Sequence, residues 1–358
     1  MELQGLKIGN KFSKYPIIQG GMGVGVSAHK LAGAVAKEGG IGIISTADIG
    51  YQEADFLKKQ VDANLRAIGT EIDQARKISP NGIIGVNIMV AVNNYEEMVR
   101  EVVKKGVDLI ISGAGLPKNL PELVKGSNTK IVPIISSEKG AKVITKMWKT
   151  KYDYTPDMII IEGPKAGGHL GFKAEELGGE NEPKLEDITK EVLIEVKKTI
   201  DSTGIEIPVI VAGGIYSGQD IARFLKLGAK GVQMATRFVA TNECDASIGF
   251  KNAYVNATQS DLAIIKSPVG MPGRAIKNIF IEKMQQGKEK ITNCCNCIRT
   301  CNPATTPYCI TKALINAVKG NIENGLIFCG ETVSKIKEIV SVHDLMQELV
   351  LEAQGAFA

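Results

Sequence analysis

Short, uninterrupted apolar runs rich in Val and Ile recur along this chain, and each run ends in Gly, Ser or another polar residue. Hydrophobicity that does not alternate is typical of strands buried on both faces, as in a parallel sheet. Stretches with helical spacing separate the runs, for example at residues 30–38, 94–105 and 221–227. The pattern predicts eight strands, at residues 16–19, 40–45, 83–89, 108–112, 131–136, 158–162, 208–212 and 231–235.

The regular alternation of strand and helix predicts the overall architecture. Eight β-then-α units favour a closed (β/α)₈ TIM barrel, an α/β fold, over an open doubly wound sheet, which remains the alternative. The long connection at residues 47–79 is expected to hold two helices. After residue 238 the rhythm breaks, and helical spacing returns near residue 340. We therefore predict a barrel formed by residues 1–241 and 340–358, with a small, mostly helical lobe, residues 242–339, inserted after strand eight.

Composition narrows the class of protein. The 358 residues are 44% hydrophobic and 23% charged, which is ordinary for a soluble enzyme and suits one barrel with an appendage. The 43 basic and 39 acidic residues give a net charge of +4 without any block of like charge, so no nucleic-acid partner is expected. No secretion signal and no apolar run of about 18 residues is present. We therefore expect a cytoplasmic protein with no membrane partner.

The first predicted strand ends in a run of glycines that contains Gly21, Met22 and Gly23. In a barrel of this type, functional groups collect where the strands meet the loops that follow them. Glycines at such a place let the backbone approach a planar ligand closely. The spacing is not that of a dinucleotide-binding fingerprint, and a flexible turn is the plainer interpretation.

The seventh and eighth predicted strands also end in small residues, and a helix is expected to begin near Ser217. Phosphate sites in barrels frequently form after these two strands, where loop amides and a helix N-terminus converge. Four small residues would supply the amides, and a threonine hydroxyl could add another donor. These residues are Gly213, Gly214, Ala235 and Thr236.

The sixth predicted strand leads into a glycine-rich loop that carries His169. Imidazole titrates near neutral pH and can move protons. A lone histidine is more often structural, but its place on a strand-end loop, opposite the expected phosphate site, favours a functional role. His29 and His343 lie in helical patterns and are interpreted as surface or packing residues.

Polar side chains also stand at or near the ends of the third, fourth, fifth and sixth predicted strands. A buried polar group needs a hydrogen-bond partner. The polar edge of a ligand would provide one, and a neighbouring loop would serve equally well. The residues are Asn87, Ser112, Ser136 and Glu162.

Taken together, these segments resemble the nitronate monooxygenase family, formerly called 2-nitropropane dioxygenases. The family includes the FMN-dependent enoyl-acyl-carrier-protein reductase II enzymes. One departure is Ala235, where the family usually has glycine. The matching segments are Pro16-Ile-Ile-Gln-Gly-Gly-Met22, Gly85-Val-Asn-Ile-Met89, Glu162-Gly-Pro-Lys-Ala-Gly-Gly-His169, Ala212-Gly-Gly-Ile215, Gly231-Val-Gln-Met-Ala-Thr-Arg-Phe238 and Arg274-Ala-Ile-Lys-Asn278.

The resemblance implies non-covalently bound FMN across the barrel mouth. The first glycine run would back the flavin ring, Asn87 and Glu162 would contact its polar edge or ribityl chain, and the small residues after strands seven and eight would hold its phosphate. His169 matches the family's active-site histidine. The cofactor-binding residues predicted in this way are Gly21, Met22, Gly23, Asn87, Ser112, Ser136, Glu162, Gly167, Gly168, Ala212, Gly213, Gly214, Met234, Ala235 and Thr236.

The resemblance leaves the reaction open. The first expectation is oxidation of alkyl nitronates with oxygen. The alternative is an enoyl-acyl-carrier-protein reductase that uses NAD(P)H as the reductant. A flavin-binding protein without turnover is a third class, which the intact His169 disfavours. A reductase must dock an acidic acyl carrier protein, for which Lys165, Lys173 and Arg274 are candidate contacts. A homodimer is a candidate assembly.

Five of the seven cysteines fall between residues 294 and 309. An odd number of cysteines in a reducing compartment argues against a disulfide framework. The spacing C-x₂-C-x₃-C-x₇-C could hold zinc or an iron–sulfur cluster, although Cys295 makes the ligand choice ambiguous and the family resemblance does not support a metal. Free thiols are the alternative. The candidate ligands are Cys294, Cys297, Cys301 and Cys309.

Overall fold

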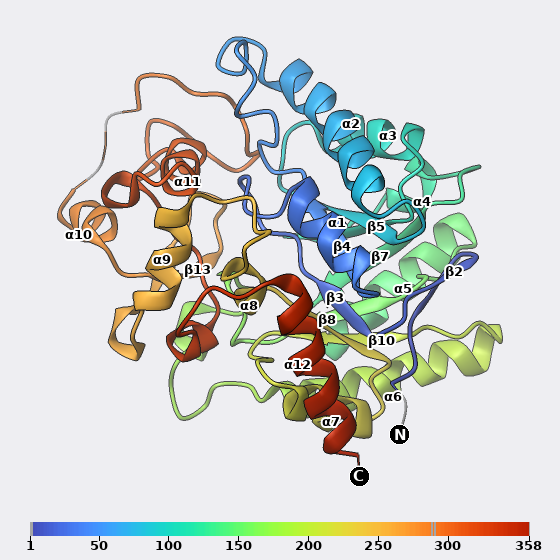
Figure 1. Ribbon diagram of the computed structural model, residues 1–358. Helices are drawn as coiled ribbons and strands as arrows, with labels where there is room; N and C mark the ends of the chain where they lie inside the picture. Colours follow the sequence, from blue (N-terminus) through green and yellow to red (C-terminus); the bar gives the residue numbers. More distant parts are fainter. Residues whose placement is uncertain (1–2, 288, 290, 358) are drawn as a thin grey trace.

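The computed structural model describes residues 3–287, 289 and 291–357. Eight parallel strands form a closed barrel, which confirms the predicted (β/α)₈ fold (Figure 1). Each of the eight predicted runs overlaps one barrel strand. The strands are β3 (Ile17–Gln19), β4 (Ile41–Ser45), β5 (Ile83–Met89), β6 (Leu109–Gly113), β7 (Lys130–Ile135), β8 (Ile159–Glu162), β10 (Val209–Ala212) and β11 (Gly231–Met234), and β11 closes the barrel on β3.

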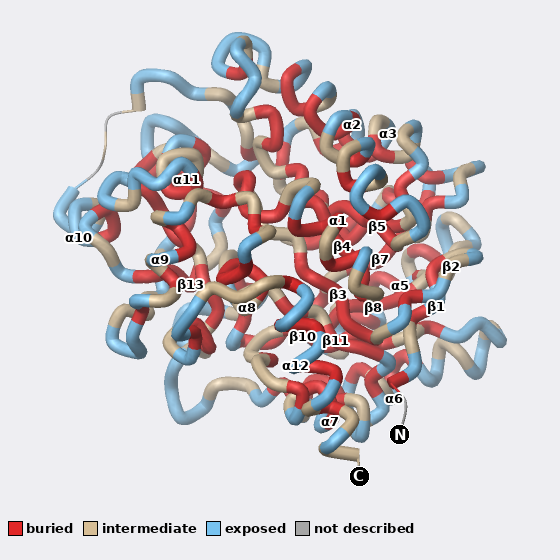
Figure 2. Tube along the Cα trace, viewed as in Figure 1, coloured by how far each residue is buried: buried red, intermediate tan, exposed pale blue. Residues whose placement is uncertain are grey.

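The strands are continuous apolar runs in the sequence because their successive side chains point to opposite faces and pack in two different buried clusters. Ile18 and Ile43 belong to a cluster built from the barrel strands and the N-terminal hairpin, β1 (Lys7–Ile8) and β2 (Lys11–Phe12). Ile17 and Ile44 belong to a larger cluster that also contains helix residues. Both faces of each strand are therefore buried, as a barrel requires. Figure 2 shows the buried core concentrated in the strands.

Helices surround the barrel, and none in the described residues is long and apolar enough to cross a membrane. The expectation of two helices at residues 47–79 is wrong, because residues 47–58 form turns and a bend. Asn64 accepts a hydrogen bond from the Gly50 amide at 2.8 Å, which fixes this segment against the helix that follows. The surrounding helices are α1 (His29–Lys37), α2 (Gln60–Ile78), α3 (Tyr95–Lys104), α4 (Leu120–Leu123), α5 (Glu138–Tyr152), α6 (Leu185–Thr203), α7 (Gly218–Lys226) and α12 (Val342–Gly355).

The segment between β11 and α12 covers the barrel mouth. It begins with the short helix α8 (Thr236–Val239) and contains β12 (Leu262–Lys266) and β13 (Pro272–Ile276). Strand β12 pairs with β13, and β13 pairs in turn with β9 (Gly168–His169). Strand β9 belongs to the loop that follows β8, so this segment directly holds the histidine loop. The division of the chain at residues 241 and 340 stays a prediction. The remaining helices are α9 (Ile248–Asn256), α10 (Ile279–Gln286) and α11 (Ile310–Val318), with short 3₁₀ turns at Ala174–Glu176, Gln259–Asp261, Ile322–Asn324 and Glu331–Lys335.

Candidate active site

A cavity of about 230 Å³ opens at the carboxyl ends of the barrel strands. Strand-end residues line one side of it, and residues of the segment between β11 and α12 line the other. Except for Ser112 and Ser136, every residue predicted to bind cofactor or act in catalysis lines this cavity. These lining residues are Gly21, Met22, Gly23, Asn87, Glu162, Gly167, Gly168, His169, Ala212, Gly213, Gly214, Met234, Ala235 and Thr236.

Glycine is required at two places in the cavity wall. A Cβ on Gly21 would lie 2.4 Å from the Cβ of Asn87, so only a bare backbone fits there. Gly213 has φ +97°, a conformation that L side chains rarely adopt, and a Cβ there would lie 3.0 Å from the Gly163 carbonyl oxygen. The wall at these two positions is backbone alone, which lets a flat or anionic ligand approach closely.

The ends of β10 and β11 form the end of the cavity where a phosphate is expected. Ala235 is the residue before α8, and its side chain does not cap this helix. The first backbone amides of α8 therefore receive no hydrogen-bond acceptor from the side chain of Ala235. Ala235 has φ −126°, so the alanine needs no glycine-like backbone conformation. The hydroxyl of Thr236 accepts a hydrogen bond from the Gly330 amide at 3.1 Å. The departure at Ala235 therefore leaves the backbone donors in place.

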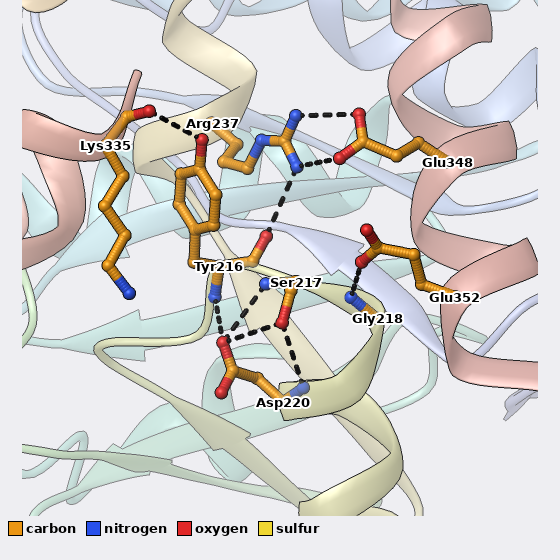
Figure 3. A network of polar contacts seen from close by, with 8 residues as sticks. All are labelled: Tyr216, Ser217, Gly218, Asp220, Arg237, Lys335, Glu348 and Glu352. Atoms are coloured by element: carbon orange, nitrogen blue, oxygen red, sulfur yellow. Dashed lines mark hydrogen bonds and ion pairs between the residues drawn. The ribbon is translucent and has the colours of Figure 1, made fainter. Parts of the chain in front are cut away.

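The N-terminus of α7 is occupied by the protein itself (Figure 3). Asp220 accepts hydrogen bonds from the amides of Tyr216 and Ser217 at 3.0 and 3.1 Å. Glu352 of α12 accepts one from the Gly218 amide at 2.7 Å. Carboxylates therefore take the amides of Tyr216, Ser217 and Gly218 at this helix end. The donors must come from the loops themselves.

Contacts from outside the barrel hold His169 in the cavity wall. Its Nε2 lies 2.7 Å from the Ser267 hydroxyl, and its ring meets Phe328 edge-on at 4.9 Å. Strand β13 pairs with the histidine loop, with Gly273 opposite His169. Burial lowers the pKa of His169 to about 4. The imidazole is therefore neutral near pH 7 and fixed in orientation.

Arg274 anchors the loop that leads to His169. Its Nη1 donates hydrogen bonds to the carbonyl oxygens of Pro164 and Ala166 at 2.6 and 2.7 Å. Its Nη2 lies 3.8 Å from Glu182 and 3.7 Å from Glu331. The side chain is buried, so Arg274 cannot dock an acidic carrier protein as the sequence suggested. Its role is to position the loop.

Three polar side chains lie deep in the cavity. Burial raises the pKa of Glu162 to about 7. The Asn87 side chain makes one long hydrogen bond, 3.5 Å from its Nδ2 to the Ile111 carbonyl oxygen. The Oε1 of Gln233 is buried and has no hydrogen-bond partner among the described residues. Buried polar atoms are rarely left unpaired, so this end of the cavity has unused capacity for a polar ligand.

Ser112 and Ser136 are not among the residues that line the cavity, and their role in cofactor binding stays a prediction. Ser112 is fully buried and donates to the Ile88 carbonyl at 2.9 Å, with the Tyr95 hydroxyl also at 2.9 Å. Its hydroxyl is therefore satisfied within the protein. Ser136 lies against Gly171, where a Cβ on the glycine would come within 2.2 Å of the serine hydroxyl oxygen. It packs under the histidine loop.

Several residues of the site were missed by the sequence reasoning. Gln233 carried the same signal as Asn87, a polar residue in an apolar strand, and could have been found. The residues contributed by the covering segment gave no comparable signal, because their distance from His169 along the chain is large. The cavity residues from that segment include Phe250, Tyr254, Leu314, Leu326, Phe328, Cys329, Gly330 and Thr332.

The predicted cysteine ligands lie in the covering segment, beside the site. Cys297 lines a small adjoining cavity that also contains Asp48 and His169. Cys294 is exposed, and the other cysteines of the cluster are partly buried. Within the described residues, no group of three or more Cys, His, Asp or Glu side chains is arranged to hold a metal ion. The four-thiolate site stays a prediction.

Comparison with known proteins gives consistent matches over nearly the whole chain. The family model described as nitronate monooxygenase matches residues 6–352. A probable nitronate monooxygenase from Staphylococcus saprophyticus is 26% identical, over 95% of each chain. The structure of FabK from Thermotoga maritima has a TM-score of 0.74 and 26% identity, covering 96% of this chain and 94% of that one. A nitroalkane oxidase from Streptomyces ansochromogenes shares the fold, with a TM-score of 0.73 at 19% identity, covering 96% of this chain and 97% of that one.

Proposed function

Because this chain belongs to the nitronate monooxygenase family, we propose that it is an FMN-dependent oxidoreductase that oxidises alkyl nitronates with oxygen. The observation that carries the proposal is the cavity at the barrel mouth. Part of its wall is glycine backbone. One end has a buried polar atom without a hydrogen-bond partner among the described residues, and the other has small residues with backbone donors. A neutral histidine stands beside residues of the covering segment. These are the features that a flavin and a small anionic substrate would need.

The residues of the cavity fit FMN in three parts. Gly21 lines the cavity and has no side chain of its own, so its backbone fits the face of a planar ring. The unpartnered Gln233 oxygen, with Asn87 and Glu162 nearby in the same lining, fits the polar edge of the ring. The phosphate would be held by Gly213, Gly214, Ala235 and Thr236.

Bound FMN would supply the redox chemistry, taking electrons from the substrate and passing them to oxygen. The contribution of the protein is to orient the substrate and exclude water. Phe328 and Leu314 add apolar surface to the cavity. His169, fixed by Ser267, offers one ring nitrogen to the substrate.

The low pKa of His169 favours a nitronate as the substrate. A base with a pKa of about 4 is poorly matched to removing a proton from a neutral nitroalkane near pH 7. A nitronate has already lost that proton, so it needs only a hydrogen-bond donor beside its charged oxygens. A neutral imidazole can provide this donor.

The second candidate is an NADH-dependent enoyl-acyl-carrier-protein reductase. The similarity to FabK supports it at the same level of identity as the similarity to the Staphylococcus protein. Burial of Arg274 removes one of the three basic residues considered for carrier docking. The other two remain accessible, because Lys173 is exposed and the Lys165 side chain is 50% exposed.

Anaerobic reduction of the FMN-loaded protein separates the two candidates. Propyl-2-nitronate and NADH are mixed with it in turn, and loss of the flavin absorbance is followed by stopped flow. We expect rapid bleaching by the nitronate and a slow response to NADH. The reverse result would replace the first candidate with the reductase, and a protein that binds no flavin would contradict both.

A further inference from the structure

One basic side chain reaches the end of the cavity where the phosphate is expected. Among the described residues that line the cavity, Lys165 is the only Lys or Arg. It lies over the glycine turn after β10, where a Cβ on Gly214 would come within 3.0 Å of the Lys165 Cβ. The Lys165 side chain is 50% exposed, so its ammonium group has room to move.

The present partner of Lys165 is Glu331. The Lys165 Nζ lies 3.0 Å from Glu331 Oε1. The other carboxylate oxygen, Oε2, lies 3.7 Å from Arg274 Nη2. Glu331 therefore has a second, buried cation beside it and does not depend on Lys165 for neutralisation. A half-exposed ion pair of this kind contributes little to stability, so Lys165 can change partner at small cost.

Backbone contacts tie the same residues to the candidate phosphate donors. The Glu331 amide donates to the Lys165 carbonyl at 3.1 Å. The preceding amide, of Gly330, donates to the Thr236 hydroxyl at 3.1 Å. The backbone of Lys165 and the loop after β11 are therefore held next to one another. The flexible end of the lysine side chain lies on the solvent side.

We propose that Lys165 is the charge partner of the flavin phosphate and that it selects FMN over riboflavin. This inference rests on the proposed function. A phosphate monoester carries about −1.5 to −2 charges at pH 7, and loop amides provide donors but no net charge. The lysine ammonium is a compact charge on a flexible stem with three donors, which suits a terminal phosphate. On binding, it exchanges the Glu331 carboxylate for the phosphate.

The test compares the binding of two flavins by the flavin-free protein. FMN and riboflavin share the ring and ribityl chain and differ in the phosphate. Each is titrated by quenching of flavin fluorescence against wild type, Lys165→Met and the matched control Lys173→Met, which alters an exposed lysine outside the cavity. Methionine keeps much of the length and apolar character of the lysine stem.

We expect Lys165→Met to weaken FMN about tenfold or more, as loss of a charge-assisted contact does, and to leave riboflavin unchanged. The FMN difference should shrink as ionic strength is raised. Glu331→Gln should act in the opposite direction and tighten FMN, because it releases Lys165 and removes a negative charge from beside the phosphate. Lys173→Met should resemble wild type with both flavins.

Two results would overturn the inference. An unchanged FMN affinity in Lys165→Met would show that the lysine does not meet the phosphate. Equal weakening of FMN and riboflavin would show that it only shapes the cavity. Both results leave the proposed function standing. A wild-type protein that binds neither flavin would instead contradict the proposed function, and the inference with it.

Discussion

Replacing Glu162 by glutamine should make the flavin-free protein more stable at alkaline pH. Glu162 stands at the end of β8 inside the cavity, and burial raises the pKa of its carboxyl from 4.5 to about 7. The folded state therefore binds this proton more tightly than the unfolded state does. Between about pH 4.5 and pH 7 the folded protein loses stability as the pH rises, because the carboxylate must ionise in a buried place.

The size of the effect follows from the shift of the pKa. Two to three pKa units at 1.36 kcal/mol each amount to about 3 kcal/mol of unfolding free energy, fully expressed above pH 8 and nearly absent at pH 4. Glutamine is neutral at every pH and resembles the protonated acid in shape. For a chain of 358 residues, an unfolding entropy of about 2 cal/mol/K per residue converts this into a shift in Tm of about 4 °C.

The assay is thermal unfolding of the flavin-free protein, wild type against Glu162→Gln, at pH 5 and pH 8. The variant should unfold at a higher temperature than wild type at pH 8, and the difference should be much smaller at pH 5. Glu175→Gln, at an exposed position, controls for the loss of one negative charge. The reasoning would be refuted if the Tm of Glu162→Gln differed from that of wild type by the same amount at both pH values. It would also be refuted if the variant were less stable than wild type at pH 8.

Three further outcomes are expected. His169→Ala should keep the yellow colour of bound FMN but lose most turnover, and an unchanged rate would reduce the histidine to a loop residue. Ser267→Ala, which removes the contact 2.7 Å from Nε2, should lower kcat about tenfold, as loss of one buried hydrogen bond would, while the flavin spectrum stays unchanged; a spectral change would point to a role in cofactor binding. If Cys294, Cys297, Cys301 and Cys309 form the predicted thiolate site, metal analysis of anaerobically purified protein should find iron or zinc in proportion to protein. A metal-free protein would contradict that prediction.

Local pattern was sufficient to predict the barrel, and together with the family resemblance it predicted part of the lining of its mouth. A strand buried on both faces is apolar at most positions, so each strand is visible in a few consecutive residues. The ends of those strands converge at one face of the barrel whatever the details of packing. That is why Gly21, Asn87, His169 and Gly213, far apart in the chain, could be placed in one site before any contact was known.

The tertiary structure decided which of those groups are free to act. Ser112 looked like Asn87 in the sequence, but the fold supplies Tyr95 and Ile88 as its partners. The N-terminus of α7 looked open to a phosphate, but α12 brings Glu352 to it from 134 residues away.

The same holds for the groups that tune His169. Ser267 lies 98 residues from it in the chain, and Phe328 is farther still. The covering segment that brings them there has no regular strand-and-helix spacing to predict its path. Hydrophobic periodicity predicts which faces of a segment are buried. It does not predict which distant side chain contacts a given polar atom. The fold and the location of the site could therefore be derived from the sequence alone, whereas the partners that set the charge state and orientation of its residues could not.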